Sequence, residues 1–317
     1  MPSFCRHNRF VENCPICSRE AQASAPPAPG RSRARGGARP GGGSSAVRIR
    51  QAARRADDGY REPLVPGLRV AEDAGRLAAD LGFAAARLEE LATSPPGLYG
   101  EVASEPDVEE ATWLAFLLAY FSPPEGGAPF ESIEAVRTSW ASGELPTLDA
   151  RVGPRSAHDP ARGPATLVAY RRWAERAGSQ AAAFTGEPHW TGARRFEQVF
   201  ERLALPGLHR AARFDLLVTL GRTGRYDLRA TSLMMRGAPV ADDASIAAKR
   251  VFGIADPMLI DRRAAALAEA CDVPFEALDL ALYNFHSGEE ARATLGAGPA
   301  ARADTVRAER AASALGV

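Results

Sequence analysis

A stripe of apolar residues between positions 70 and 91 constrains the fold of this chain most strongly. Apolar side chains recur there at steps of three and four residues, at Val70, Ala74, Leu77, Leu81, Ala84, Leu88 and Leu91. This spacing predicts an amphipathic α-helix, because it places all of them on one helical face. A second segment, 113–121, is apolar nearly all round. It predicts a central buried helix, introduced by cap and first-turn signals at 104–107.

The rest of the central region also indicates helices, so the predicted fold class is all-α. Apolar periodicity predicts helices over 196–203, 211–220, 245–252 and 275–285. Asp256-Pro257 supplies an N-cap and a first-turn proline for another helix. Sustained strand alternation is absent, although 216–220 could form a strand in isolation. The segment 141–165 is rich in Pro, Gly and Arg and is expected to form a long loop.

Composition divides the chain into four parts. Residues 1–18 contain three of the four cysteines, and residues 19–62 are rich in Ala, Pro, Gly, Ser and Arg. The second part cannot bury enough apolar surface to offset its ordering entropy, so we expect a disordered, flexible linker. Residues 63–287 form the helical body. Residues 288–317 return to Ala, Gly, Arg and Glu, which indicates a flexible tail or a weak helix.

The N-terminal part carries a metal-ligand pattern. Cys5, His7, Cys14 and Cys17 give two ligand pairs around a short loop. Three thiolates and one imidazole are a donor set that suits tetrahedral zinc, and four protein ligands leave no open position. The pattern therefore predicts a structural zinc knob, and the alternative is a run of reduced or disulfide-prone cysteines in a disordered tail. Cys271 stands alone on a predicted helix and is expected to be a small buried hydrophobe.

The linker is strongly basic, although the chain as a whole has no net charge. The chain has 39 basic and 39 acidic residues, but eight arginines and no acidic residue lie between Arg31 and Arg55. The rest of the chain therefore carries a net charge of −8. Such a segment would attract phosphates without reading sequence. The alternative is a soluble tether whose arginines reflect codon composition, since Lys249 is the only lysine.

A short motif separates two of the predicted helices. Leu203-Ala204-Leu205-Pro206-Gly207-Leu208-His209 resembles the helix-hairpin-helix motif of DNA-binding proteins, which reads Leu-Pro-Gly-hydrophobic-Gly. In such a hairpin, backbone N–H groups at a helix N-terminus bind phosphate. The resemblance makes Pro206, Gly207, Leu208, His209 and Arg210 candidate DNA contacts, although His209 stands where the family has a second glycine. The alternative is an ordinary helix–helix turn.

The order of elements resembles that of the helix-hairpin-helix DNA glycosylase superfamily. There, a buried helix precedes the hairpin, and an aspartate at a later helix start lines the base pocket. Asp256, in a segment that reads Asp-Pro-Met-Leu-Ile-Asp-Arg, is the first candidate. Asp261 is the second, and the adjacent Asp242 and Asp243 are the third. The 49 residues between hairpin and Asp256 exceed the family's usual spacing and imply an insertion or another assignment.

The body further resembles the alpha-glutamyl/putrescinyl-thymine pyrophosphorylase families, clade 3 in particular, over about residues 65–287. That resemblance implies an enzyme that acts on hypermodified thymine in DNA, where an amine displaces pyrophosphate from an activated 5-hydroxymethyl group. An ionised aspartate beside a flipped-out nucleotide could stabilise positive charge on the sugar or orient a nucleophile. The sequence has no phosphate-loop, dinucleotide-turn or nucleophile-elbow motif.

Two alternative functions that are not enzymatic stay open. One is a non-catalytic DNA-binding adaptor that recruits a protein through the zinc knob, and the other is a helical interaction module with no nucleic-acid role. The expected partners are DNA and possible protein partners of the knob. The longest apolar run, 111–121, is too short for a bilayer, which needs roughly 20 residues. We therefore expect a cytoplasmic protein without a membrane partner.

Overall fold

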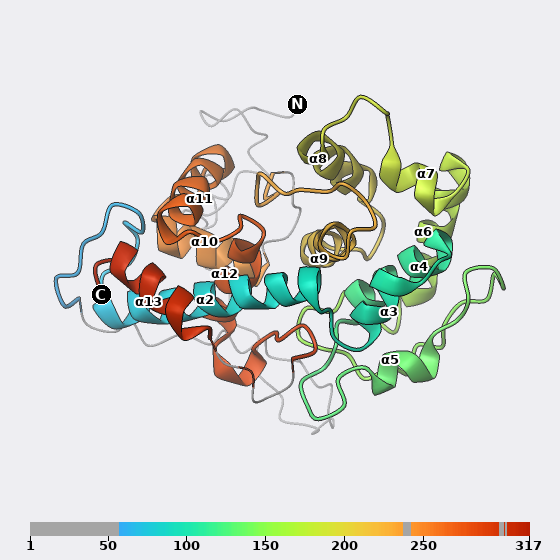
Figure 1. The fold of residues 1–317 in the computed structure, drawn as a ribbon, viewed down its shortest axis with the longest axis horizontal. Coiled ribbons are helices and arrows are strands. Elements are labelled where there is room, and N and C mark those ends of the chain that lie inside the picture. The colour runs from blue at the N-terminus through green and yellow to red at the C-terminus, as the bar shows by residue number, and fades with distance from the viewer. Residues whose placement is uncertain (1–56, 237–241, 298–300, 302) are drawn as a thin grey trace, which may run out of the picture. The chain divides into compact units, whose positions relative to one another are not determined.

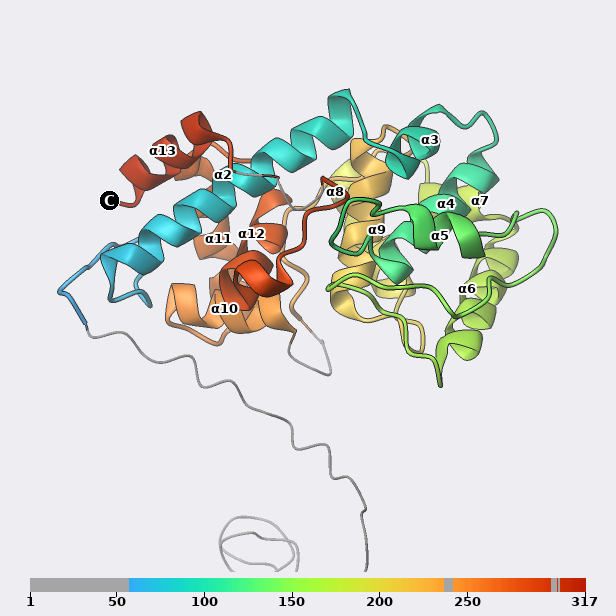
Figure 2. The same ribbon diagram turned by 90° about the horizontal axis from the view of Figure 1, so that it is seen from below.

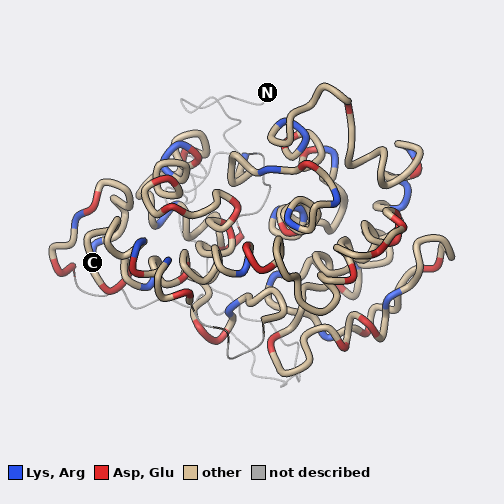
Figure 3. Tube along the Cα trace, viewed as in Figure 1, with Lys and Arg blue, Asp and Glu red and all other residues tan. Residues whose placement is uncertain are grey.

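The structure, a computed structural model, describes residues 57–236, 242–297, 301 and 303–317. The chain divides into two units, 1–53 and 54–317, and all described residues belong to the second. Within them the fold is all-α and contains no strand (Figure 1). Figure 3 shows that basic and acidic residues are both spread over these helices. The helices are α2 (Ala71–Thr93), α3 (Leu98–Ser104), α4 (Val108–Phe121), α5 (Glu131–Val136), α6 (Gly163–Ala177), α7 (Gln180–Thr185), α8 (Gly192–Arg202), α9 (Arg210–Arg222), α10 (Asp243–Phe252), α11 (Pro257–Cys271), α12 (Ala277–Ser287), the 3₁₀ helix η2 (Glu289–Ala291) and α13 (Thr305–Ala314).

Helix α2 is the longest helix described, and it contacts elements from both halves of the body. The apolar stripe predicted from the sequence is its buried face, since Leu77, Leu81 and Leu88 are at most 2% exposed. Figures 1 and 2 both show α10–α13 beside its N-terminal half and α3–α7 beyond its C-terminal end, with α8 and α9 between the two groups. Helices α9, α12 and α13 all pack against α2. One helix therefore connects the two groups.

Helix α4 is the buried central helix that the sequence predicts. Asp107 caps it, since the Glu109 N–H donates to Asp107 Oδ1 over 2.8 Å. Every residue from 111 to 121 is buried. The Phe116 ring stacks on Tyr170 of α6, with 3.8 Å between the ring centroids. Because Tyr170 is fully buried, this contact fixes the inner face of α6 against α4.

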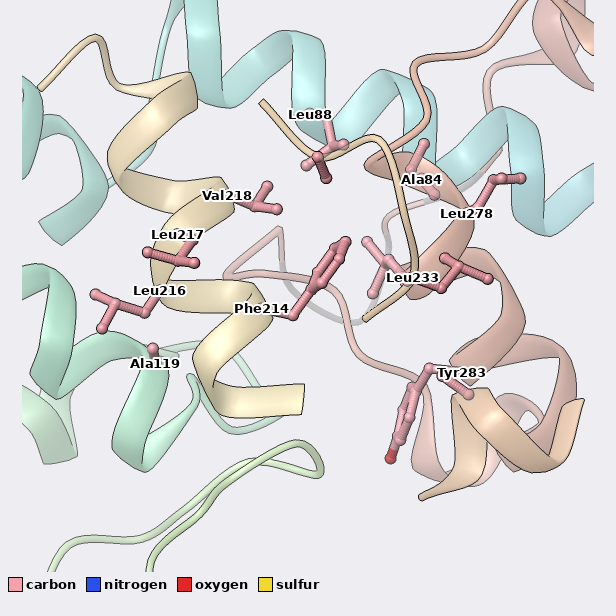
Figure 4. Packing of buried hydrophobic residues seen from close by; sticks show 14 of the residues in the cluster. Ala84, Leu88, Ala119, Phe214, Leu216, Leu217, Val218, Leu233, Leu278 and Tyr283 are labelled. Atoms are coloured by element: carbon pink, nitrogen blue, oxygen red, sulfur yellow. The ribbon is translucent and has the colours of Figure 1, made fainter. Parts of the chain in front are cut away.

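The hydrophobic core continues from α4 through α9 to the helices around α2. Figure 4 shows Phe214 of α9 pointing toward Leu233, with Leu88 of α2 and Leu278 of α12 close by. Phe214 and Leu233 are buried, and both belong to the same core cluster as Leu88 and Leu278. Burial of such side chains contributes about 1.5–3 kcal/mol each. The two groups of helices thus share one core.

Two segments near the ends of the body differ from the expectations. The region 288–317, expected to be a flexible tail or weak helix, contains η2 and α13, and α13 packs along α2. Gly82 permits this close approach, since a Cβ there would lie 2.7 Å from the Ala308 amide nitrogen. Residues 57–62, assigned to the linker, are also placed: Tyr60 Oη donates to the Leu315 carbonyl over 2.6 Å. Helix α13 packs on α2 through alanine residues, so its sequence shows little apolar periodicity.

The remaining expectations about secondary structure concern the segments 216–220 and 141–165 and a membrane span. The stretch 216–220 lies inside α9, because the flanking helical turns extend on both sides of it. No helix lies between α5 and α6, so most of 141–165 is the long loop that was expected. No helix among the described residues is long and apolar enough to span a membrane.

Candidate functional site

The hairpin motif is the turn between α8 and α9. Leu208 is buried and anchors the turn in the core, whereas Pro206 and Gly207 are exposed at its tip. The amides of Gly207 and His209 donate to no acceptor among the described residues. The turn thus presents free N–H groups at the start of a 13-residue helix, as a phosphate-binding hairpin requires.

Gly207 is required by the geometry of the turn. Its φ is +79°, in the left-handed region, which L side chains rarely adopt. A Cβ there would lie 2.2 Å from Thr166 Oγ1 on α6. The hairpin and α6 are therefore packed side by side at this point.

His209, which replaces the family's second glycine, caps α9. The Ala212 N–H donates to its Nδ1 over 3.3 Å, so Nε2 carries the proton in this arrangement and donates to the Ser156 carbonyl over 2.9 Å. Both ring nitrogens are occupied within the chain. His209 therefore ties the hairpin to the loop before α6, and its amide, rather than its ring, is free for a ligand.

Arg210, expected to contact DNA, is instead 3% exposed. Its Nε donates to Asp242 Oδ2 over 2.5 Å, and its Nη1 donates to the Leu233 carbonyl over 2.8 Å. The first turn of α9 directs this side chain into the protein, toward Asp242 at the start of α10 and Asp279 of α12. Its guanidinium is not available to a phosphate in this structure.

Arg210 belongs to a buried charge cluster formed with Arg155, Asp215, Asp279 and Asp242. Arg155 binds Asp215 in a bidentate pair, with distances of 2.8 and 2.7 Å. Its Nη2 also lies 2.6 Å from Asp279 Oδ2, while Arg210 Nη1 lies 2.7 Å from Asp279 Oδ1. Asp279 of α12 thus lies between two guanidinium groups. The cluster joins α9, α10, α12 and the loop before α6.

The electrostatics of the cluster follow from burial opposed by pairing. Burial alone would raise the pKa of Asp279, but Arg210 and Arg155 hold it below its usual value. The pKa of Asp215 is raised by burial, which its pairing with Arg155 offsets only in part. Arg155 Nη1 and Arg210 Nη2 are buried without a hydrogen-bond partner among the described residues. The pKa values of Asp279 and Asp215 thus shift in opposite directions, since Asp279 has two arginine partners and Asp215 has one.

Asp256, the first candidate for catalysis, is an exposed N-cap. The Leu259 N–H donates to its Oδ1 over 3.0 Å, which satisfies the first turn of α11. Its other oxygen has no partner among the described residues. Met258 and Leu259 beside it are 62% and 45% exposed. The start of α11 thus combines a solvent-facing carboxylate with apolar side chains.

Asp261, the second candidate, holds an internal loop. Its Oδ1 accepts from the Leu233 N–H over 2.9 Å, and burial raises its pKa. Because Arg210 binds the carbonyl of the same residue, Leu233 is fixed from both sides. The half-buried Asp261 carboxylate is thus engaged in positioning the 228–236 segment.

The third pair, Asp242 and Asp243, also has partners inside the chain. Asp242 Oδ1 caps α10 by accepting from the Ser245 N–H over 2.9 Å, and its Oδ2 binds Arg210. Asp243 lies 3.8 Å from His286 Nε2 on α12. Among the described residues, no hydrogen bond or ion pair joins the hairpin tip to Asp256. The predicted site residues therefore fall into separate groups: Asp242, Asp261 and Arg210 around Leu233, Pro206, Gly207 and His209 at the hairpin tip, and Asp256 alone at the start of α11.

A groove of about 350 Å³, which the sequence reading missed, lies between α6 and the hairpin. Its walls are formed by Ala165, Val168, Ala169, Arg172, Arg176, Leu205 and Pro206. Arg172 and Arg176 are exposed and have no ion pair or hydrogen bond with another described residue. Their spacing of four residues, in line with Ala165 and Ala169, was the available signal, but it is hidden among 38 arginines.

The predicted zinc ligands Cys5, His7, Cys14 and Cys17 lie outside the described residues. Within the described part of the chain, no group of three or more His, Cys, Asp or Glu side chains could hold a metal ion. Cys271 is buried on α11 as a free thiol, as expected for a small hydrophobe, and burial raises its pKa to about 11.

No protein-family model, curated protein or solved structure matches the chain. What the protein does has therefore to be inferred from its own residues.

Proposed function

We propose that the chain is a helix-hairpin-helix, glycosylase-like DNA-binding protein that acts on a modified, thymine-type base. The observation that carries this proposal is the exposed α8–α9 hairpin. Its tip leaves the amides of Gly207 and His209 without acceptors, while Leu208 fixes the turn in the core. Free amides at a helix N-terminus are a favourable site for a DNA phosphate.

The order of elements supports a glycosylase-like assignment. The buried helix α4 precedes the hairpin, and Asp256 caps helix α11 after the hairpin. Among the candidate carboxylates, Asp256 suits catalysis better than Asp261, because Asp256 keeps one oxygen free in solvent. Asp261 is engaged with Leu233. Beside Asp256, the exposed Met258 and Leu259 offer apolar contact to a base.

The role proposed for Asp256 is to orient the nucleophile. Displacement of pyrophosphate at the 5-hydroxymethyl carbon leaves the glycosidic bond intact. An ionised carboxylate beside the flipped-out nucleotide would therefore hold the attacking amine while the C–N bond forms and the C–O bond to pyrophosphate breaks. The resemblance to thymine pyrophosphorylases supplies the substrate class, a 5-modified thymine. It also supplies the reaction type, in which an amine displaces pyrophosphate.

The N-terminal residues complete the proposal. Cys5, His7, Cys14 and Cys17 would hold a structural zinc ion, since thiolate and imidazole donors suit zinc. The arginines between positions 31 and 55 would add a phosphate contact on the same chain and raise affinity through effective concentration. Elemental analysis of the purified chain should give one zinc per chain, lost in C14S/C17S and retained in C271S. Zinc retained in C14S/C17S would refute this ligand set.

The catalytic part is tested with the full chain, an amine as nucleophile, and duplex DNA containing either thymine or thymine with a pyrophosphorylated 5-hydroxymethyl group. Binding and the mass of the released or altered base are measured for the wild type and for Asp256→Asn. Asparagine is also a good N-cap, so helix α11 should be preserved. We expect turnover to be lost while binding is kept. Asp304→Asn, which changes the N-cap of α13, is the matched control and should leave both unchanged.

Two outcomes would contradict parts of this proposal. DNA binding without any change to the base, in the wild type, would leave a non-catalytic DNA-binding adaptor. Unchanged turnover in Asp256→Asn would exclude this residue as the catalytic carboxylate.

The hairpin is tested by a charge at its exposed tip. Pro206→Glu places a carboxylate where a phosphate is proposed to lie and should weaken DNA binding strongly, whereas Pro206→Gln, of similar size, should have a smaller effect. Equal DNA affinity of both variants and the wild type would remove the hairpin from the interface.

A further inference from the structure

The groove between α6 and the hairpin contains two exposed arginines without partners among the described residues. We propose that this groove binds the phosphodiester backbone of one DNA strand, with Arg172 and Arg176 each contacting one of two neighbouring phosphates. This inference rests on the proposed function, because it extends the DNA contact beyond the hairpin.

The lining of the groove suits a phosphate backbone. No acidic residue lines it, so nothing in its walls opposes an anion. Ala165 and Ala169 have short side chains, which let a strand approach α6 closely. Leu205 and Pro206 of the hairpin form the opposite wall. A strand in the groove therefore passes directly beside the amides of the hairpin tip.

The spacing of the two arginines matches a single strand. They are four residues apart on one helix face, so their Cα atoms are separated by about 6 Å along the axis. Neighbouring phosphates on one strand are separated by a similar distance. Arginine also presents a planar set of donors that suits phosphate oxygens.

Helix α6 holds these arginines on a fixed support. Leu167, Tyr170 and Trp173 bury the opposite face, and Tyr170 Oη donates to Gln180 Oε1 over 2.7 Å. The adjacent Arg171, in contrast, is engaged within the protein. Its guanidinium lies 4.3 Å from the Trp140 ring centroid and donates to the Trp140 carbonyl. Arg172 and Arg176 have no such engagement, which leaves them free for a ligand.

The test is the salt dependence of duplex DNA affinity, measured with the full chain. R172Q/R176Q removes two positive charges from the groove. R69Q/K249Q removes two from exposed side chains that have no hydrogen bond or ion pair with another described residue and do not line the groove. Each lost phosphate contact lowers the slope of log affinity against log salt by about 1. We expect the slope to fall by about 2 in R172Q/R176Q and to stay near the wild-type value in the control.

The outcomes separate this inference from the proposed function. If the wild type binds DNA and Pro206→Glu weakens binding, but R172Q/R176Q keeps the wild-type slope, the groove assignment fails and the hairpin assignment stands. If both double variants lower the slope equally, net charge is responsible and the groove assignment again fails. If the wild type shows no salt-dependent DNA binding, the proposed function fails. Displacement of DNA by poly-glutamate in the wild type but not in R172Q/R176Q, at matched charge, would assign the groove to an acidic protein instead.

Discussion

Two pairs of arginines lie near the hairpin, and their surroundings differ completely. Arg155 and Arg210 are buried, 0% and 2% exposed in their side chains, and are held by three aspartates. Arg172 and Arg176 are exposed and have no partner among the described residues. The same residue type thus stabilises the fold in one place and is free for a ligand in the other. Partners and burial, rather than arginine content, separate the two roles.

The largest effect is expected where the buried pair loses its shared partner. Asp279→Ala removes the carboxylate that Arg155 and Arg210 share, so each buried guanidinium keeps only one aspartate, Asp215 or Asp242. Breaking a buried ion pair in this way costs about 3–5 kcal/mol of unfolding free energy. Denaturant unfolding measures it. Glu101→Ala removes an exposed partner of Arg137 and should change stability by less than about 1 kcal/mol. Equal stability of both variants would show that the cluster is not what holds these helices together.

A second buried pair is expected to respond to pH. Asp80 lies 3.0 Å from Arg292, but burial raises its pKa to about 7. Its folded pKa therefore exceeds the unfolded value, so its contribution to stability is full below pH 4 and is lost as pH rises through 7. A shift of about 3 units corresponds to at most about 4 kcal/mol. Asp80→Asn should remove the decline in unfolding free energy between pH 4 and 8.

The control for this pH effect is an exposed carboxyl group whose pKa is shifted in the opposite direction. A hydrogen bond from Arg61 lowers the pKa of Asp57 to about 2. Its contribution is full above the unfolded pKa and is lost as pH falls to about 2, so the difference in stability between Asp57→Asn and the wild type should be constant from pH 4 to 8 and shrink below pH 4. A wild-type stability that rises from pH 4 to 8, and does so equally in Asp80→Asn, would contradict the raised pKa of Asp80.

A smaller effect is expected at the glycine that brings the hairpin against α6. Gly207→Ala combines a positive φ with a clash on Thr166, whereas Gly224→Ala meets a positive φ of +73° in open space. We expect a loss of about 1 kcal/mol for Gly224→Ala and about 2–3 kcal/mol for Gly207→Ala. Adding Thr166→Ala to Gly207→Ala should recover most of the difference, since it removes the clashing oxygen. No recovery in this double variant would mean that Thr166 does not set the approach of hairpin and α6.

The sequence predicts those parts of the fold that depend on local patterns. The stripe of α2, the apolar run of α4 and the caps at Asp107 and Asp256 are short-range signals, and the structure confirms them. Helix α13 was expected only as a weak helix, the alternative to a flexible tail, because its packing on α2 uses Gly82 and small side chains, which leave a weak apolar pattern.

The charge cluster could not be predicted, because its members are far apart in sequence. Arg155 and Asp279, for example, are 124 residues apart. For the same reason Arg210 was expected to face DNA: its position after Gly207 is local information, whereas its burial depends on α10 and α12. The groove needs the packing of α6 against the hairpin, which only the tertiary structure supplies.

The central claim is that the hairpin tip binds DNA, and amide hydrogen exchange tests it most directly. Exchange of the full chain is measured with and without a saturating duplex that contains 5-modified thymine, and the peptide covering 203–211 is followed. We predict slower exchange there, at the free amides of Gly207 and His209, and no change in a peptide covering the bend at 125–128, where Gly127 and Ala128 are exposed. Unchanged exchange over 203–211 while DNA is bound would contradict it.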